Sequence, residues 1–205
     1  MAKIINYKLC GISAVVLILF LLSGRATHSG EKIFKQQDYT TADKYILDVN
    51  LKIPDELRNY SVVLPSGGAL VSDFKFDLGQ DISENIEKVV RSSFNNVKIN
   101  SDDEKLKNAF DATIDVQVVL ISWTRPMYAN QDVETVMFFE WTLANSEGDP
   151  IWIRTVKGVG TSTLWDREPS VYRALEDVFR NSFKEITNSY ETRIQPISAI
   201  KLRSE

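Results

Sequence analysis

The sequence predicts an α+β fold in which a mostly antiparallel sheet carries two helices packed on one of its faces. Three observations predict it. Strand-like segments come first, followed by a helix, three strands in succession and a closing helix. The strand segments alternate apolar and polar residues with a period of two, whereas the two helical segments carry an apolar stripe. The chain of 205 residues is 43% hydrophobic and 25% charged, which is typical of a globular protein with one core.

The first strands are defined by alternation and by the residues that interrupt it. Tyr45–Ile53 places every second residue, all of them apolar, on one face, and Pro54 ends the segment. Tyr60–Leu64 and Ala69–Leu78 are predicted as two further strands, separated by Pro65, Ser66, Gly67 and Gly68.

The first helix is predicted over Asp81–Phe94. Asp81 and Glu84 have the spacing of a capping box, in which the first side chain caps a free amide of the helix and the second reaches back. One stripe of this helix is expected to face the core: Ile82, Ile86, Val89, Val90 and Ser93.

The second half begins with a short strand at Val97–Ile99 and continues with the most strand-like segment of the chain, Ala112–Trp123. In this segment we expect Ile114, Val116, Val118 and Leu120 to share one face, and Val119, Ile121 and Trp123 the other. Val133–Leu143 and Ile151–Val156 are predicted to form a hairpin around the turn residues 145–150. These three strands make the antiparallel part of the predicted sheet.

The closing helix is predicted over Pro169–Tyr190, with its apolar stripe toward the sheet: Val171, Ala174, Leu175, Val178, Phe179, Ser182, Ile186 and Tyr190. The preceding segment Gly158–Thr163 is glycine-rich and is predicted to be flexible. The single domain therefore spans residues 45–190, and residues 191–205 form a C-terminal tail.

Composition excludes several kinds of chemistry. The chain has 24 basic and 28 acidic residues, a net charge of −4, which argues against a general nucleic-acid binder. Its one cysteine, Cys10, and its one histidine, His28, lie before the predicted domain. The domain therefore has no residues for Cys–His or Ser–His–Asp catalysis or for a zinc site built from cysteine and histidine. We expect no cofactor and no metal.

The N-terminus has the features of an export signal. Lys3 and Lys8 precede a 14-residue apolar run, Leu9–Leu22, and the small residues Gly24 and Ala26 follow it. The run is shorter than the roughly 17–25 residues of a spanning helix. Residues 1–26 are thus predicted to be a signal peptide cleaved after Ala26 or, alternatively, a retained N-terminal membrane anchor. Either form of the export signal predicts that the domain lies in the periplasm. Residues 27–44 are polar and are predicted to be a tether between this N-terminal segment and the domain.

The order of segments resembles one bacterial family. FKFDLGQDISENIEKVVRSSFNNVKI, FDATIDVQVVLISW, VMFFEWTLANSEGDPIWIRTVKGVGTST and VYRALEDVFRNSFKEI are similar in layout to the YajG-type envelope lipoproteins, over about residues 70–190. The resemblance implies an envelope location and an α+β fold. The chain departs from the family because no cysteine follows the apolar run, so the lipid anchor of that family is not implied here.

Two loops carry residue types that are enriched at protein interfaces. Large aromatic rings and arginines provide contact area at modest entropic cost. Loop 124–132 and the segment 158–167 combine these types, and the candidate binding residues are Trp123, Arg125, Tyr128, Trp165 and Arg167. The alternative is that the two tryptophans close the ends of the core and that Arg125 pairs with a nearby aspartate.

Two classes of function follow. The first is a non-enzymatic, exported envelope protein that binds a partner protein in an assembly or accessory role. The alternative is a periplasmic hydrolase that works with carboxylates alone, for which Asp115 and Glu140 are the available pair. Asp115 shares its predicted face with Thr113 and Gln117, which favours a solvated strand face over a catalytic pair, so we expect a protein that is not an enzyme.

Overall fold

The computed structural model describes residues 39–40, 44–64, 73–99, 110–124, 132–163 and 168–189. The predicted signal or anchor and the predicted tail lie outside this range. Within it, the elements follow one another in the order β1 (Tyr45–Lys52), α2 (Asp55–Arg58), β2 (Ser61–Leu64), β3 (Phe74–Asp77), α3 (Gly79–Ser93), β4 (Phe94–Ile99), β5 (Ala112–Trp123), β6 (Val133–Asn145), β7 (Pro150–Ser162) and α4 (Glu168–Asn188).

The main sheet has five strands in the order β4-β1-β5-β6-β7, and β2 and β3 form a separate two-stranded sheet. β1 runs parallel to both of its neighbours, while β5, β6 and β7 are antiparallel. The fold is α+β, but the predicted mostly antiparallel sheet is wrong, because two of the four strand pairings are parallel. The connection from β1 to β4 contains α3, which provides the crossover that parallel neighbours require, and β5 also joins β1 in the parallel direction.

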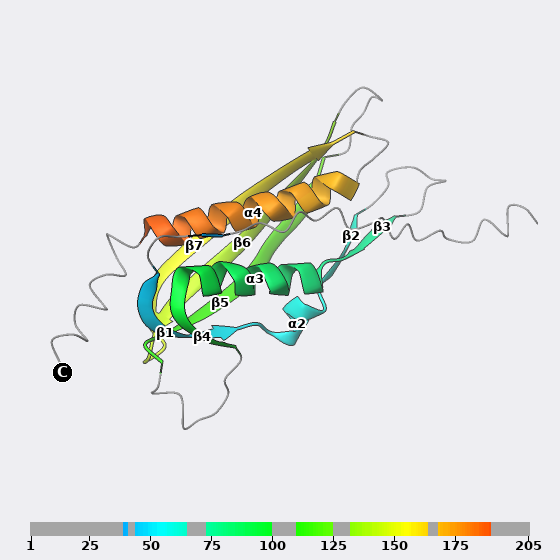
Figure 1. The fold of residues 1–205 in the computed structure, drawn as a ribbon. Helices are drawn as coiled ribbons and strands as arrows, with labels where there is room; N and C mark the ends of the chain where they lie inside the picture. The colour runs from blue at the N-terminus through cyan, green and yellow to red at the C-terminus, as the bar shows by residue number, and fades with distance from the viewer. Residues whose placement is uncertain are drawn as a thin grey trace, which may run out of the picture.

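Both long helices lie on the same side of this sheet, which we call its inner face (Figure 1). α4 packs on β6 and β7, α3 packs on β1 and β4, and the two helices contact each other. Every described residue of the predicted helical stripes is buried, from Ile82 to Ser93 in α3 and from Val171 to Ile186 in α4. The largest buried side chains of the core include Trp141, Phe94, Phe139 and Phe179.

α3 begins two residues earlier than predicted, and its capping box is not formed. Leu78 is the N-cap and makes no side-chain capping bond, while Asp81 is buried inside the first turn. Gly79 sets this start, because a Cβ there would lie 2.0 Å from the backbone oxygen of Arg58. Only glycine allows the chain to pass this close to α2 and turn into the helix.

The segment Gly158–Thr163, predicted to be flexible, is instead the second half of β7, which continues to Ser162. Its two inner glycines let α4 rest directly on the strand, since a Cβ on Gly160 would lie 2.0 Å from the backbone oxygen of Ser170. The hydroxyls of Thr135 and Ser170, both buried, are hydrogen-bonded at 2.7 Å and join β6 to the first turn of α4.

α4 also covers the open edge of β7. The Asp177 carboxylate accepts a hydrogen bond from the backbone N–H of Val159 at 3.0 Å. Arg173 donates to the backbone oxygen of Thr161, and Asn181 donates to that of Lys157. Edge strands are prone to pair with other chains through their free backbone groups. These three side chains, spaced four residues apart on α4, bind backbone groups of β7 and so disfavour such pairing at this edge.

Tyr39, which lies within the segment predicted to be a tether, is buried against Phe183 of α4, with ring centroids 5.2 Å apart. Burial raises the pKa of its phenol to about 12, with Arg180 opposing the shift. No described residue forms a hydrogen bond with the Tyr39 hydroxyl. By contrast, the buried hydroxyl of Tyr45 donates to the backbone oxygen of Ile186.

These two tyrosines give a matched pair of variants. Tyr39→Phe is expected to leave the free energy of unfolding unchanged or to raise it, because the lost hydroxyl is buried without a hydrogen bond to the described residues. Tyr45→Phe is expected to lower it by about 1–2 kcal/mol, because the bond to Ile186 is lost. Urea unfolding of both variants measures the difference, and equal destabilisation would contradict this account.

Candidate functional site

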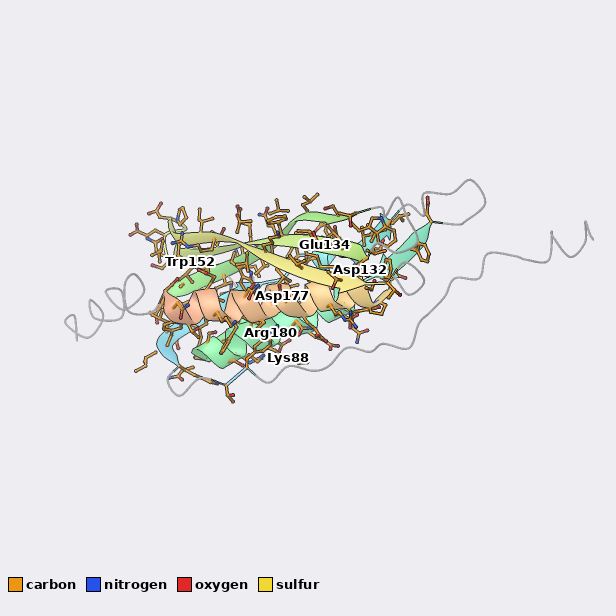
Figure 2. The ribbon with its side chains drawn as sticks, turned by 90° about the horizontal axis from the view of Figure 1, so that it is seen from above. Lys88, Asp132, Glu134, Trp152, Asp177 and Arg180 are labelled. Carbon is orange, nitrogen blue, oxygen red and sulfur yellow. The ribbon has the colours of Figure 1, made fainter. Side chains whose placement is uncertain are left out.

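The outer face of the sheet, opposite α3 and α4, is not covered by any element of the described part of the chain. Figure 2 shows the helices on one side of the sheet and side chains standing free on the other. The burial of β6 follows this arrangement, because its residues alternate between buried and half-exposed along nearly the whole strand. The half-exposed residues of β6 face outward together with their cross-strand partners.

A bulge in β5 changes which side chains reach this face. Val118 pairs with Phe139, but Leu120 pairs with Phe138, so Val119 is the extra residue. Beyond the bulge, Leu120 faces outward, whereas Ile121 and Trp123 face inward opposite Met137 and Thr135. The predicted assignment of Leu120 to the inner face, and of Ile121 and Trp123 to the other, is therefore wrong, because one extra residue reverses the alternation.

The result is a group of apolar side chains on the outer face, which we call the outer patch. Leu120 and Val119 are 48% and 57% exposed. Phe138 lies opposite Leu120, and Val136 lies opposite Val159 of β7. Val136, Phe138 and Val159 are half-exposed. The outer patch thus consists of Val119, Leu120, Val136, Phe138 and Val159.

Charged side chains border the outer patch. Lys157 lies opposite Phe138 on β7, and Glu134 and Glu140 lie two residues to either side of Val136 and Phe138 on β6. An apolar centre with a polar rim is the usual anatomy of a protein–protein contact surface. Exposed apolar side chains that are contiguous, as here, are more informative than single ones.

The two loops with the predicted binding residues leave the sheet at the same end. Val133 is in register with Ser162, so the start of β6 and the end of β7 lie side by side. At the base of the first loop, the Thr124 N–H donates to the Glu134 oxygen at 2.8 Å, and the Glu134 N–H donates to the Thr124 hydroxyl at 3.0 Å. The outer patch occupies the sheet positions next to this loop end.

The structure places only one of the five predicted binding residues. Trp123 is half-buried on the inner face and meets Phe74 of β3 edge-on, with ring centroids 5.8 Å apart. It therefore links the β2–β3 sheet to the end of β5, and it packs against the core. Arg125, Tyr128, Trp165 and Arg167 lie outside the described residues.

The sequence alone does not predict the outer patch. The signal that it offers is the run from Val116 to Ile121, which has apolar residues on both faces of one strand, together with Val136–Phe139 in the next. Without the position of the bulge, these residues could not be divided between the core and the surface.

The carboxylates of the hydrolase alternative lie on the same outer face. Asp115 pairs with Thr142 and Glu140 pairs with Gln117, so the two acids are diagonal neighbours on β5 and β6. Neither lines the small apolar cavity beneath Trp152 or the groove beside α3. Among the described residues, no group of three or more histidine, cysteine, aspartate or glutamate side chains is arranged to hold a metal ion.

The structure is similar to several solved bacterial proteins, one of which shares the fold. Protein XCC0632 from Xanthomonas campestris, of the DUF330 family, matches with a TM-score of 0.53 at 7% sequence identity, over 74% of this chain and 89% of that chain. A minor lipoprotein from Acinetobacter baumannii matches with a TM-score of 0.37 at 11% identity, over 72% and 92% of the two chains. Lipoprotein GNA1162 from Neisseria meningitidis matches with a TM-score of 0.36 at 12% identity, over 67% and 99%.

The similarity to XCC0632 shows a shared fold and nothing of function. No protein-family model matches the sequence, and no curated protein matches it. The comparisons thus support a fold that is found in a solved bacterial protein, without singling out the YajG-type family. In the described part of the chain, no helix has both the length and the apolar character needed to cross a membrane.

Proposed function

We propose that this chain is a non-enzymatic, exported protein of the bacterial cell envelope that acts by binding a partner protein at the loop end of its sheet. The observation that carries the proposal is the outer patch, five apolar residues on a sheet face that no described element covers. Burying such a surface against another protein is favourable by about 25 cal/mol for each Å² of apolar area.

The export part of the proposal rests on the N-terminal sequence. A basic start, a short apolar run and small residues at 24 and 26 are the pattern of a secretory signal. In the periplasm the protein is either released by cleavage or held at the inner membrane by the uncleaved segment 1–26. If residues 1–26 are removed, 21 basic and 28 acidic residues remain, and this acidity does not favour binding to anionic lipid.

The four candidate residues outside the described range complete the proposed site. Arg125 and Tyr128 belong to the loop between β5 and β6, and Trp165 and Arg167 to the connection between β7 and α4. The register of β6 and β7 supports placing both connections beside the outer patch. Arginine and aromatic residues next to an apolar centre are the composition of a binding hot spot.

Photocrosslinking in the native bacterium tests this proposal. Benzoylphenylalanine is introduced at Leu120 or Phe138 in the outer patch, at Tyr128 in the loop, and at the exposed Glu147 in the opposite turn as control. We expect one adduct of the same mass from the first three positions and none from Glu147. Adducts from Glu147 at equal yield would overturn the proposed site, and an adduct of twice the chain's mass would replace the partner by a second copy.

A further inference from the structure

Tyr39 attaches the end of the predicted tether to the helix layer formed by α3 and α4. Its side chain is 8% exposed, and its ring meets that of Phe183 of α4, with the centroids 5.2 Å apart. Burial dominates the raised pKa of the Tyr39 phenol, while Arg180 lowers that pKa and Glu176 raises it, so these two residues of α4 lie near the ring. Arg180 stands on the helix side of the molecule, away from the outer face (Figure 2). The tether therefore meets the domain on the side opposite the outer patch.

The attachment at Tyr39 differs from the one that follows at Tyr45. Both side chains are buried, but the Tyr45 hydroxyl donates to the backbone oxygen of Ile186, and Tyr45 begins β1, which pairs with β4 and β5. The Tyr39 hydroxyl forms no hydrogen bond with any described residue. Burial of the ring favours the docked position of Tyr39, whereas the loss of water from an unbonded hydroxyl opposes it. We therefore expect Tyr39 to leave α4 far more readily than Tyr45 leaves the core.

The described residues between Tyr39 and β1 add little to this attachment. Thr40 is exposed, and Lys44 donates from Nζ to the backbone oxygen of Arg91 at 2.8 Å in an exposed hydrogen bond. One buried side chain and a solvent-exposed hydrogen bond are the features of a segment that opens locally while the rest of a domain stays folded. After such an opening, the chain is held from Tyr45 onward.

We propose that Tyr39 is a releasable latch that holds the tether against α4 and lengthens the tether when it opens. With Tyr39 docked, the tether comprises residues 27–38, and with Tyr39 released it extends to residue 44. The six added residues span at most about 20 Å when fully extended. If residues 1–26 are retained as an anchor, the domain reaches further from the membrane by up to this distance. The latch itself depends neither on the anchor nor on the outer patch, so the latch and the proposed function can fail separately.

Double electron–electron resonance on the full chain, in a mild non-ionic detergent, measures the latch. Spin labels are attached at Thr40→Cys and Glu147→Cys, which replace exposed residues, and Cys10→Ser removes the native thiol. A docked Tyr39 gives a narrow distribution of distances between the labels and a released one gives a broad distribution, so the two areas give the ratio of docked to released protein. Urea below the global unfolding transition brings both populations into range. Labels at Lys184→Cys and Glu147→Cys, both within the folded domain, are the control pair.

Two variants of Tyr39 change this ratio in opposite directions. Tyr39→Phe removes the unbonded hydroxyl and keeps the ring, so we expect the ratio of docked to released protein to rise at least threefold. Tyr39→Ala removes the ring, so we expect the ratio to fall at least tenfold, while the control pair keeps its distance distribution in both variants.

Three results would overturn the latch. A ratio lowered by Tyr39→Phe would show that the hydroxyl has a partner, and a narrow distribution that persists in Tyr39→Ala would show that other contacts hold the segment. A broad distribution in the wild type without urea would show that Tyr39 does not dock. Release of Tyr39 in the wild type only where tryptophan fluorescence reports global unfolding would likewise contradict the proposal, because Tyr39 would then be an integral part of the core.

Discussion

Gly160→Val is expected to lower the free energy of unfolding by about 3 kcal/mol or more, one of the largest effects of a single substitution in this protein. A Cβ at this position would lie 2.0 Å from the Ser170 oxygen and 2.4 Å from the Ala174 nitrogen. Both are backbone atoms of α4, so the helix itself must move away from β7. That movement also breaks the buried hydrogen bond between Thr135 and Ser170.

Gly148→Ala is the matched control for this prediction. Gly148 has φ of 93° in the turn between β6 and β7, and a Cβ there meets no atom within 4 Å. The positive φ alone disfavours a side chain at this position, so Gly148→Ala is expected to lower the free energy of unfolding by about 1–2 kcal/mol. Urea unfolding followed by tryptophan fluorescence measures both variants, and a Gly160→Val protein as stable as Gly148→Ala would show that α4 does not rest on this strand.

Val116→Asp is expected to lower the free energy of unfolding by several kcal/mol, because it places an unpaired charge in the core. Val116 is 1% exposed on the inner face of β5, in register with the fully buried Trp141. The matched control is Gln117→Asp, which puts the same side chain one residue further on, at an exposed position of the outer face.

The pair is compared by thermal unfolding and by urea titration at neutral pH. We expect Gln117→Asp to unfold within a few degrees of the wild type and Val116→Asp to be unfolded or strongly destabilised. Similar stability of the two variants would mean that β5 is not a central strand of the sheet.

The parts of the fold that sequence predicts well are those with local signals. The turn residues between β6 and β7 identify a hairpin, and the alternation of Ala112–Trp123 gives the bounds of β5. The stripes of α3 and α4 predict their buried faces, because the period of the helix alone decides which residues share a face.

The errors concern long-range arrangement. Alternation in Tyr45–Ile53 predicts a strand but carries no information on its direction. β1 is parallel to β4 through the crossover that contains α3, and β5 also pairs with β1 in the parallel direction. Glycine is locally permissive, so the sequence predicts flexibility at 158–163, whereas Gly158 and Gly160 in fact allow α4 to pack directly on β7. That requirement is visible only when the helix is in place.

The candidate site also combines features that the sequence can predict with one that it cannot. Arginine and tryptophan in two loops can be recognised from composition, and the register of β6 and β7 brings the bases of those loops together. The outer patch depends on the bulge at Val119, which moves Leu120 outward and Trp123 inward. A single extra residue in a ladder has no signature in the alternation on either side of it.

The most direct test of the proposed function is the dissociation constant of the full chain with the crosslinked partner, measured by isothermal titration calorimetry. Three variants are compared with the wild type: Leu120→Lys in the outer patch, Arg125→Ala in the loop, and Thr142→Lys further along the outer face as control. We predict that Leu120→Lys weakens binding at least tenfold, about 1.4 kcal/mol, and Arg125→Ala by more than about 1 kcal/mol, while Thr142→Lys binds as the wild type does. Wild-type affinity in all three variants, with the fold intact, would contradict the account.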